Sequence, residues 1–463
     1  MSDGLAALAQ MPAWLVELDD SQRVQTALKR VVPGLRRAKL SGVRFKPGKW
    51  TARCTLVLEK GEQEVSLAAT IVPPGQDEPE FDTQASGRPD SEGWRCWIPE
   101  LRLQLESKAE PEAELPALAL LTDPQRARAF LEGAVRSGAP AYRDFRIISA
   151  KPKVMRYSPG SRCTVLYRLE LPAEARAANW PDVVVAKTYH RSDKGRIAWD
   201  GMRALWHSPI ATSGIVEVAE PLAWLPDEKI LVQGPIREER TLKELLLATF
   251  SGREAGSQDQ LFDYVGKTAV GLAELHCSGA LSTEHTNWEE ELAEVRDLLG
   301  RLTSVFPQLD GAAGPFLEDI ERLAARIPAD AAVPAHRSFR PAQVLLYKGH
   351  IGFIDFDGFC QCEPALDVAL FRATARDLAM SALPPDTPLE ERLETIDHLC
   401  EHFLASYEAL APISRERVAL WEALDLMTNV LHSWTKAKPA RLVHALALLR
   451  HHNAGLAGLL ARS

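Results

Sequence analysis

The stretch AHRSFRPAQVLLYKGHIGFIDFDGFCQCEPALDVALF, residues 335–371, decides the fold of this chain. Two apolar runs in it flank residues 348–350, Lys-Gly-His, and such a pattern predicts a β-hairpin. From about residue 237 onward the apolar residues otherwise recur at helical spacing, as in residues 261–275 and 389–407. The hairpin is therefore the exception in a second half that we expect to be mainly helical.

Before this helical half, the chain repeats a pattern of helix, hairpin and strand. Residues 18–32, LDDSQRVQTALKRVV, resemble residues 121–135, LTDPQRARAFLEGAV, with Asp20 and Asp123 in the position of N-caps. Each helix is followed by a hairpin with a Pro-Gly turn, which needs a positive φ at the glycine, and by a strand rich in β-branched residues. We interpret the two copies as an ancient duplication, and two unrelated units of helix and hairpin are the alternative.

Composition limits the class of protein. At 463 residues the chain is long enough for two or three domains, and its formal charge of -9 argues against a nucleic-acid partner. The sequence has neither a signal peptide pattern nor a long uncharged apolar run, so we expect no membrane insertion. Seven scattered cysteines do not form a disulfide framework. A cytoplasmic protein with a small-molecule partner is the simplest interpretation.

Two polar stretches suggest where domains end. Residues 73–93 are rich in proline, glycine and acidic residues and cannot build a core, and a second polar stretch begins at Glu106. We therefore predict an N-terminal α+β domain at residues 1–115, a small β-rich lobe at 116–235 and a helical lobe at 236–463.

The order of motifs in residues 335–371 resembles that of the aminoglycoside phosphotransferase and choline kinase-like family. That family has a His-x-Asp-x-x-x-x-Asn loop, a short hairpin, an Ile-Asp-Phe/Trp segment and a Pro-Ala-Leu-Asp helix start. The resemblance covers residues 116–463. It implies an α+β, bilobal protein kinase-like fold, here preceded by an α+β domain like a second copy of the small lobe, and it implies ATP, or another nucleotide, and Mg²⁺ as cofactors.

By this resemblance, four residues occupy the catalytic and metal positions. His336 is the loop histidine, Gln343 stands at the metal-binding asparagine, and Asp355 stands at the aspartate that holds Mg²⁺ across the nucleotide phosphates. Asp357 follows on the same segment. Asp367 matches an aspartate that caps and anchors the next helix, and we expect its role to be structural.

The strand VVVAKTY contains Lys187, a lone charge in an apolar run. In kinases the equivalent lysine pairs with nucleotide phosphates and with an acid on the next helix, where this chain offers Asp200 or, less well placed, Asp193. A solvated lysine at a strand edge is the alternative. The first copy of the repeat has Ala69 at the corresponding place and therefore no phosphate lysine.

Two further segments fit the same family layout. The segment ILVQGPIREERTLKELL, which contains Gln233, is predicted to be the hinge between lobes, whose backbone groups would bind a purine; Thr241 and Glu244 form a capping box in it. The segment VGLAELHCSGALS resembles the helix end before the catalytic loop. Its His276 is alternatively a helix C-terminal residue that the macrodipole favours.

The chain departs from the family pattern at the most important position. Ser338 stands where the family has the aspartate that accepts the proton of the substrate hydroxyl, and general-base catalysis contributes roughly 10² to 10⁴ in rate. Gln343 keeps the amide oxygen of the family's asparagine but moves it by one methylene, which is less favourable for Mg²⁺. Asp357 is a candidate substitute base, although an acid at this place more often serves the metal.

Three functions follow from these residues. The first is a nucleotide-binding pseudokinase with a regulatory or scaffolding role, in which the N-terminal copy offers a surface for a protein partner or for a homo-oligomer. The second is an active ATP-dependent O-phosphotransferase of a small-molecule substrate that the sequence does not identify. The third is a kinase-fold enzyme with another transfer, such as adenylylation.

Overall fold

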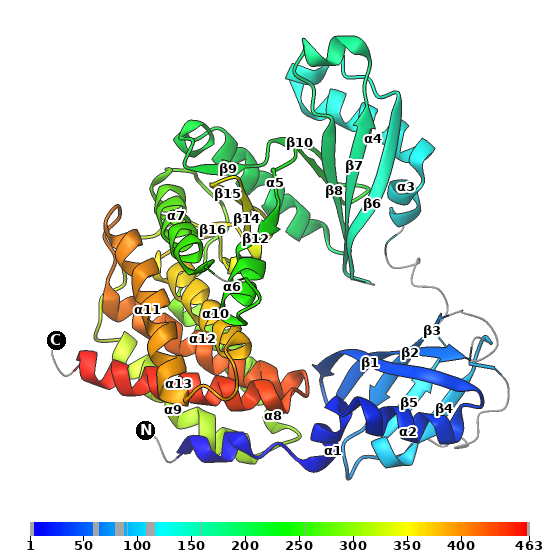
Figure 1. Cartoon of the computed structure of the whole chain (residues 1–463), viewed down its shortest axis with the longest axis vertical. Coiled ribbons are helices and arrows are strands. Elements are labelled where there is room, and N and C mark those ends of the chain that lie inside the picture. Colours follow the sequence, from blue (N-terminus) through cyan, green and yellow to red (C-terminus); the bar gives the residue numbers. More distant parts are fainter. Residues whose placement is uncertain are drawn as a thin grey trace. The chain divides into compact units, whose positions relative to one another are not determined.

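A computed structural model describes residues 4–58, 64–78, 88–89, 91–107, 115, 117–158, 160–254 and 256–460. The chain divides into two compact units that interleave in sequence (Figure 1). Unit 1 comprises Met1–Ala109, Trp288–Ile327 and Glu422–Ser463, and unit 2 comprises Glu110–Asn287 and Pro328–Trp421. The predicted α+β class is confirmed, as are a small β-rich part and a larger helical part in the second unit. The division at residues 115 and 235 stays a prediction.

Unit 1 joins an antiparallel sheet to helices from two later parts of the chain. The sheet has the order β1-β2-β3-β5-β4, and α2 packs along it. Its elements are α1 (Ala13–Val16), α2 (Ser21–Val31), β1 (Leu35–Lys46), β2 (Lys49–Leu58), β3 (Glu64–Ile71), β4 (Arg95–Ile98), β5 (Leu103–Glu106), α8 (Trp288–Thr303), α9 (Gln308–Ala324) and α13 (Pro439–Leu460). Helix α12 (Arg415–Thr435) passes from unit 2 into unit 1.

An aromatic cluster holds the three segments of unit 1 together. Trp50, fully buried on β2, lies with its ring centroid 5.5 Å from that of Trp14 and 5.7 Å from that of Phe306. The Trp50 indole N–H donates to the Trp434 carbonyl, and the Trp434 indole N–H donates to the Leu8 carbonyl. Large buried aromatics supply much of a core's stabilisation, so the N-terminal sheet depends on residues near the end of the chain.

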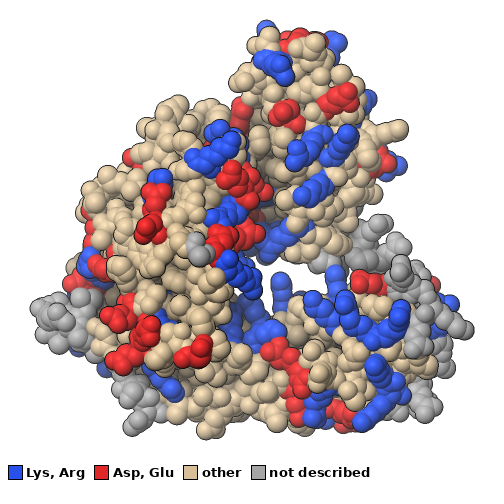
Figure 2. Space-filling model, in the orientation of Figure 1, with Lys and Arg blue, Asp and Glu red and all other residues tan. Residues whose placement is uncertain are grey.

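The opposite face of the β1–β2 hairpin is exposed and basic. The register of the hairpin sets six exposed side chains on this one face: Arg37, Lys39, Arg44, Lys46, Lys49 and Arg53. Figure 2 shows Lys and Arg side chains gathered over this part of unit 1. Since the whole chain has a net charge of -9, positive charge is concentrated here against the overall balance.

Unit 2 begins with the small sheet, whose order is β10-β11-β8-β7-β6. Helix α4 covers one face, where Val165, Val184 and Ala186 join its core, and Asp123 caps α4 by accepting from two backbone N–H groups. The elements are α3 (Leu118–Thr122), α4 (Pro124–Gly138), β6 (Ser149–Ser158), β7 (Arg162–Glu170), β8 (Val183–Tyr189), α5 (Ser192–Trp206), β10 (Pro221–Leu225) and β11 (Ile230–Gln233).

The two five-stranded sheets have the same strand order and the same N-capped helix before the first strand. Gly48 and Gly160 have positive φ, as the predicted turns require, while Pro159 lies outside the described residues. Counted from these glycines, Ala52 pairs with Ala69 at the position where Thr164 pairs with Lys187. Ala69 thus occupies the register position of Lys187, as the repeat predicts.

The described helical part of unit 2 carries four short strand pairings that position its loops. Strands β14 and β15 form the predicted hairpin, β12 and β9 flank it, and β13 pairs with β16. The elements are β9 (Val216–Val218), β12 (Arg240–Thr241), α6 (Leu242–Phe250), α7 (Gln258–Cys277), β13 (Val333–Ala335), β14 (Val344–Tyr347), β15 (His350–Phe353), β16 (Cys360–Cys362), α10 (Ala365–Ala382) and α11 (Leu389–Glu408). No helix in the described part of the chain is both long and apolar enough to cross a bilayer.

Candidate active site

Two strand pairs hold the candidate catalytic loop beside the candidate metal loop. The first loop, residues 336–343, runs from the end of β13 to the start of β14, and the second, residues 354–359, runs from the end of β15 to the start of β16. Since β13 pairs with β16 and β14 with β15, both loops are fixed at both ends. The backbone N–H of Ile354 also donates to the Gln343 carbonyl at 3.1 Å. The two motifs of the sequence therefore form one site.

Lys187 contacts this site from the small sheet. Its Nζ lies 3.2 Å from Asp355 Oδ1 and 3.9 Å from Asp357 Oδ1, although 168 residues separate Lys187 from Asp355 in the chain. The Lys187 side chain is only 11% exposed. It is therefore neither the solvated lysine of the alternative reading nor an unpaired buried charge.

Two further partners of the carboxylates, Arg162 and Tyr189, were not predicted from the sequence. Arg162 Nη1 donates to Asp357 Oδ2 at 2.9 Å and lies 3.5 Å from Asp355 Oδ1, and the Tyr189 hydroxyl donates to Asp357 Oδ1 at 2.9 Å. Both were recognisable by strand periodicity, since Tyr189 stands two residues after Lys187 and pairs directly with Arg162 across the β7–β8 register. The four charges form a neutral ion network (Lys187, Arg162, Asp355 and Asp357).

The pKa values of the two carboxyl groups are shifted in opposite directions. Burial alone would raise the pKa of Asp355, but the Lys187 ammonium and the Arg162 guanidinium hold it well below its usual range. Burial raises the pKa of Asp357; the Lys187 ammonium opposes this shift, the negative charge of Asp355 adds to it, and Tyr189 and Arg162 oppose it more weakly. Asp355 is therefore the stable anion of the pair, and Asp357 is the carboxyl that accepts a proton more readily.

The candidate catalytic loop begins with a fully buried histidine, and both of its ring nitrogens form hydrogen bonds. His336 Nε2 lies 3.0 Å from the Ile354 carbonyl oxygen, and its Nδ1 lies 3.2 Å from the Ser338 hydroxyl oxygen. The backbone N–H of His336 donates to Asp367 at 2.5 Å. Ser338, at the place of the family's aspartate, is half-buried. It is thus hydrogen-bonded to the loop histidine.

Asp367 anchors the loop rather than capping its helix by a side-chain bond. It is fully buried in the first turn of α10, and its Oδ2 receives the His336 N–H and lies 3.3 Å from His276 Nε2. His276 Nδ1 lies 2.7 Å from the Tyr407 hydroxyl. His276 stands in the last turn of α7, as the alternative has it, and it is also a buried link between α7, α10 and α11.

Backbone conformation at the site is unusual. Arg337 has φ 61° and Asp355 has φ 75°, a left-handed region that residues other than glycine rarely adopt. A Cβ on Gly358 would lie 3.4 Å from Arg337 Cβ and 3.5 Å from the His336 carbonyl oxygen, so the two loops touch closely. Such conformations persist where surrounding structure enforces them, and they cluster at functional sites.

Gln343 carries an unsatisfied oxygen that fits a metal role. Its Oε1 is buried and has no hydrogen-bond partner among the described residues, although such a group is costly to leave unpaired. An amide oxygen together with the Asp355 carboxylate is the type of donor set that Mg²⁺ takes alongside nucleotide phosphates. Within the described ranges, no group of three or more His, Cys, Asp or Glu side chains is arranged to hold a metal by itself. The residues present fit a cation that the nucleotide helps to bind.

Helix α5 brings no acid to Lys187. Asp200 pairs with Arg196 at 3.0 Å and is about half exposed, and Asp193 pairs with Arg191. The predicted pairing of Asp200 with Lys187 is therefore not what the structure has, because the lysine is occupied by the metal-loop carboxylates. Gln233 is buried at the end of β11, in the segment predicted as the hinge. Nucleotide contacts of Asp200 and Gln233 stay predictions.

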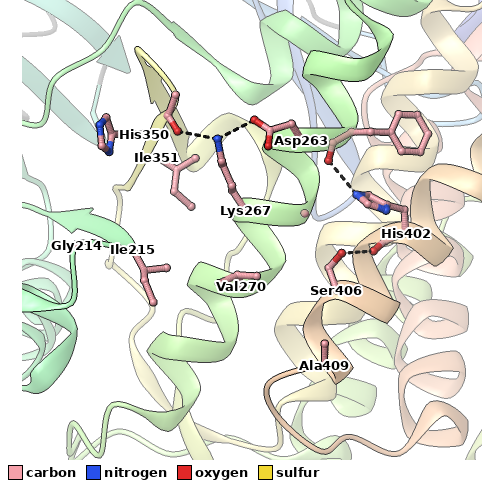
Figure 3. Close-up of a pocket in the computed structure, with 13 residues that line it drawn as sticks. Gly214, Ile215, Asp263, Lys267, Val270, His350, Ile351, His402, Ser406 and Ala409 are labelled. Carbon is pink, nitrogen blue, oxygen red and sulfur yellow. Dashed lines mark hydrogen bonds and ion pairs between the residues drawn. The ribbon is translucent and has the colours of Figure 1, made fainter.

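A separate cavity of about 770 Å³ lies elsewhere in unit 2, between α7, α11 and the β14–β15 hairpin (Figure 3). Lys267 there donates to Asp263 at 2.7 Å and to the Gly349 carbonyl at 3.1 Å, and Ser406 donates to the His402 carbonyl. None of the four residues of the ion network lines this cavity. Lys267 and Asp263 therefore form a solvent-exposed ion pair, one helical turn apart, outside the candidate site.

No protein-family model and no curated protein matches this chain. The structure is similar to a choline/ethanolamine kinase family protein from Mesorhizobium loti, with a TM-score of 0.44 and 12% identity over 66% of this chain and 92% of that one. Choline kinase LicA from Streptococcus pneumoniae gives 0.43 and 15% over 69% and 96%. An ADP-bound aminoglycoside phosphotransferase gives 0.42 and 13% over 69% and 98%. These solved structures are of the choline kinase and aminoglycoside phosphotransferase kind that residues 335–371 resemble.

Proposed function

We propose that this chain is an aminoglycoside phosphotransferase-like protein that binds a nucleotide with Mg²⁺ and has an impaired capacity to phosphorylate small molecules. The observation that carries the proposal is the contact of Lys187 with Asp355 at 3.2 Å. The orphaned oxygen of Gln343 supports the metal part of it.

In this proposal the chain's own residues divide the work of binding. Asp355 and Gln343 would hold the cation, which when bound neutralises phosphate charge. Lys187 and Arg162 now neutralise the carboxylates, and either can turn to phosphate oxygens once a cation occupies the carboxylates. The ion network is therefore neutral before a nucleotide binds, and Lys187 and Arg162 become available to the phosphate charge once the cation takes their place on the carboxylates.

Impairment follows from the loop chemistry. Ser338 has no charge with which to orient or deprotonate an external hydroxyl, and its own hydroxyl is bonded to His336. Loss of a general base costs roughly 10² to 10⁴ in rate. A regulatory or scaffolding role fits such a site, and the basic face of the β1–β2 hairpin is a surface for an acidic protein partner or for a second copy of the chain. With its seven cysteines all as free thiols, we assign the protein to the reducing cytoplasm.

Calorimetric titration of the purified protein with ATP, with and without Mg²⁺, tests the proposal. Lys187→Ala and Asp355→Asn should each weaken Mg²⁺-dependent binding at least tenfold, or about 1.4 kcal/mol. Lys267→Ala and Asp263→Asn are matched controls, because they break a lysine–aspartate pair outside the site. Undiminished binding in both site variants would refute the proposal.

An active O-phosphotransferase is a second candidate, and the raised pKa of Asp357 favours it. A carboxyl that holds a proton more readily than usual is a better base near neutral pH. This candidate predicts ATP turnover with a small-molecule acceptor that Asp357→Asn abolishes while nucleotide affinity is kept. The mass of the product separates phosphoryl transfer from adenylyl transfer, the third possibility.

A further inference from the structure

The hydrogen bonds of His336 define which groups donate and which accept. A carbonyl oxygen only accepts, so the 3.0 Å contact with the Ile354 carbonyl requires a hydrogen on His336 Nε2. In the neutral imidazole the other nitrogen, Nδ1, then carries a lone pair. The Ser338 hydroxyl at 3.2 Å must therefore donate to Nδ1. Ser338 has a base directly on its hydroxyl, with the ring held in the required tautomer.

The same contacts hold this pair beside the metal loop. Ile354 immediately precedes Asp355, and Gly358 packs against the backbone of His336 and the side chain of Arg337. Ser338 is half-buried whereas His336 is fully buried, so Ser338 is the more exposed residue of the pair.

We infer that Ser338 is itself a phosphoryl acceptor, with His336 as its base, so that the protein phosphorylates its own catalytic loop. The inference rests on the proposed nucleotide site. The bond between the γ-phosphorus of ATP and its bridging oxygen breaks, and ADP leaves with the electron pair. A bond forms between Ser338 Oγ and phosphorus, and the hydroxyl proton passes to His336 Nδ1. The His336 Nε2–H bond to Ile354 is kept throughout.

This assignment explains the loop substitution chemically. An aspartate at position 338 would activate a hydroxyl brought by a substrate, whereas the serine brings the hydroxyl and takes the base from His336. The phosphoserine that forms carries close to two negative charges near neutral pH. It would stand beside Asp355 and Asp357, and their repulsion would disfavour a second nucleotide. The modification would therefore switch the site off.

The test uses the full-length protein incubated with ATP and Mg²⁺ and analysed by intact and peptide mass spectrometry. We expect one added phosphoryl group, located at Ser338. Ser338→Ala and Ser338→Asp should both stay unmodified, while Ser381→Ala, which removes an exposed hydroxyl on α10, should be modified like the wild type. Calorimetry on the same samples reports nucleotide binding separately.

A second measurement needs no nucleotide. In Ser338→Cys the thiol faces His336 Nδ1, so it should ionise below its ordinary pKa of about 8.5. The rate of its alkylation against pH, followed on its own peptide to separate it from the exposed Cys277, reports this. Adding His336→Asn should return the thiol to ordinary behaviour.

The outcomes separate the two proposals. Phosphorylation at Ser338 together with an acidified thiol supports the inference. If the wild type binds Mg²⁺-ATP but Ser338 stays unmodified, or if the phosphoryl group is found on another residue, the inference is wrong and the nucleotide site stands. If no nucleotide binds at all, both are wrong.

Discussion

At the scale of single residues, Asp355 and Asp357 lie in one loop and contact the same two cationic side chains at different distances. Asp355 lies within 3.5 Å of both Lys187 and Arg162, whereas Asp357 is 2.9 Å from Arg162 but 3.9 Å from Lys187. Burial disfavours the ionised form of each group. For Asp355 the ion pairs outweigh the cost of burial and its pKa is lowered. For Asp357 they do not, and its pKa is raised, which makes Asp357 the weaker acid of the two.

Asp355→Asn should lower the free energy of unfolding at neutral pH by roughly 1.5–3 kcal/mol, since Lys187 then faces a neutral amide. In the unfolded chain this carboxyl titrates near pH 3.9. Its lowered folded-state pKa adds stability above that value, and this stability is lost as the pH falls through the folded-state pKa. The deficit of the variant should therefore shrink below about pH 4. Urea unfolding at a series of pH values measures it.

Asp357→Asn should show the opposite trend. The raised folded-state pKa of Asp357 means that the wild type loses stability as the pH rises from about 3.9 through that pKa. Asparagine removes this dependence, and its side-chain oxygen still accepts the Tyr189 hydroxyl. Relative to the wild type, the Asp357→Asn variant should therefore gain stability as the pH rises. Urea unfolding at the same series of pH values measures this difference, with Asp263→Asn as the control. If the variant instead lost stability relative to the wild type as the pH rises, the raised pKa of Asp357 would be contradicted.

The sequence indicates Asp355, Gln343 and Lys187 as candidates because each stands in a local pattern, a loop motif or a strand with one charge. It did not identify Arg162, because an arginine after a turn has no local signature and its partner lies 195 residues away. The alternation of strand residues was the available signal, since Arg162 faces Tyr189 across the hairpin. The wrong pairing of Asp200 has the same origin: ion-pair choice depends on three-dimensional distances.

At the scale of elements, helix α5 contacts the metal loop through a glycine. A Cβ on Gly201 would lie 2.7 Å from Phe359, which is fully buried two residues after Asp357. Distances under 3.0 Å force something to shift, and neither the helix nor a buried ring at this place can move without moving the loop. The helix therefore supports the site by close packing rather than by an acid.

Gly201→Ala should destabilise the protein by roughly 1–3 kcal/mol and weaken Mg²⁺-ATP binding several-fold, because Phe359 and its loop are displaced. Gly133→Ala is the matched control, since its added Cβ on the exposed face of α4 meets nothing within 4 Å. That substitution should raise stability by about 0.5–1 kcal/mol. Thermal unfolding and calorimetry of both variants test this, and equal effects at both glycines would contradict it.

At the scale of the whole molecule, unit 1 is built from three separate segments of the chain. Sequence patterns predicted the helix, the hairpin and the strand of its N-terminal part, since these depend on local periodicity and turn residues. They did not predict that α8, α9, α13 and the end of α12 complete its core, because the hydrogen bond of Trp50 to Trp434 on α12 spans 384 residues. That the N-terminal sheet descends from a duplicated small lobe stays a prediction, with the shared strand order in its favour.

Trp434→Ala should lower the stability of unit 1 by roughly 3–5 kcal/mol, because it removes a fully buried indole and its hydrogen bond to Leu8. Trp224→Ala is a control in unit 2, where the ring packs against Tyr189 and is half-buried. Tryptophan fluorescence during urea unfolding reports both. If unit 1 unfolds independently, Trp434→Ala should separate its transition from that of unit 2. An unchanged single transition in Trp434→Ala would argue against the role of the aromatic cluster.

The composite core of unit 1 has a consequence for synthesis on the ribosome. Trp50 emerges early, but Phe306 is made only after the first segment of unit 2, and Trp434 only after the whole of unit 2, has been translated. During that interval the core face of the N-terminal sheet around Trp50 is incompletely covered and contacts water. Exposed apolar surface of this kind promotes aggregation or chaperone binding. A chain that stopped before residue 434 would lack the hydrogen bonds that link Trp434 to Trp50 and to Leu8, so this sheet would keep only part of its core.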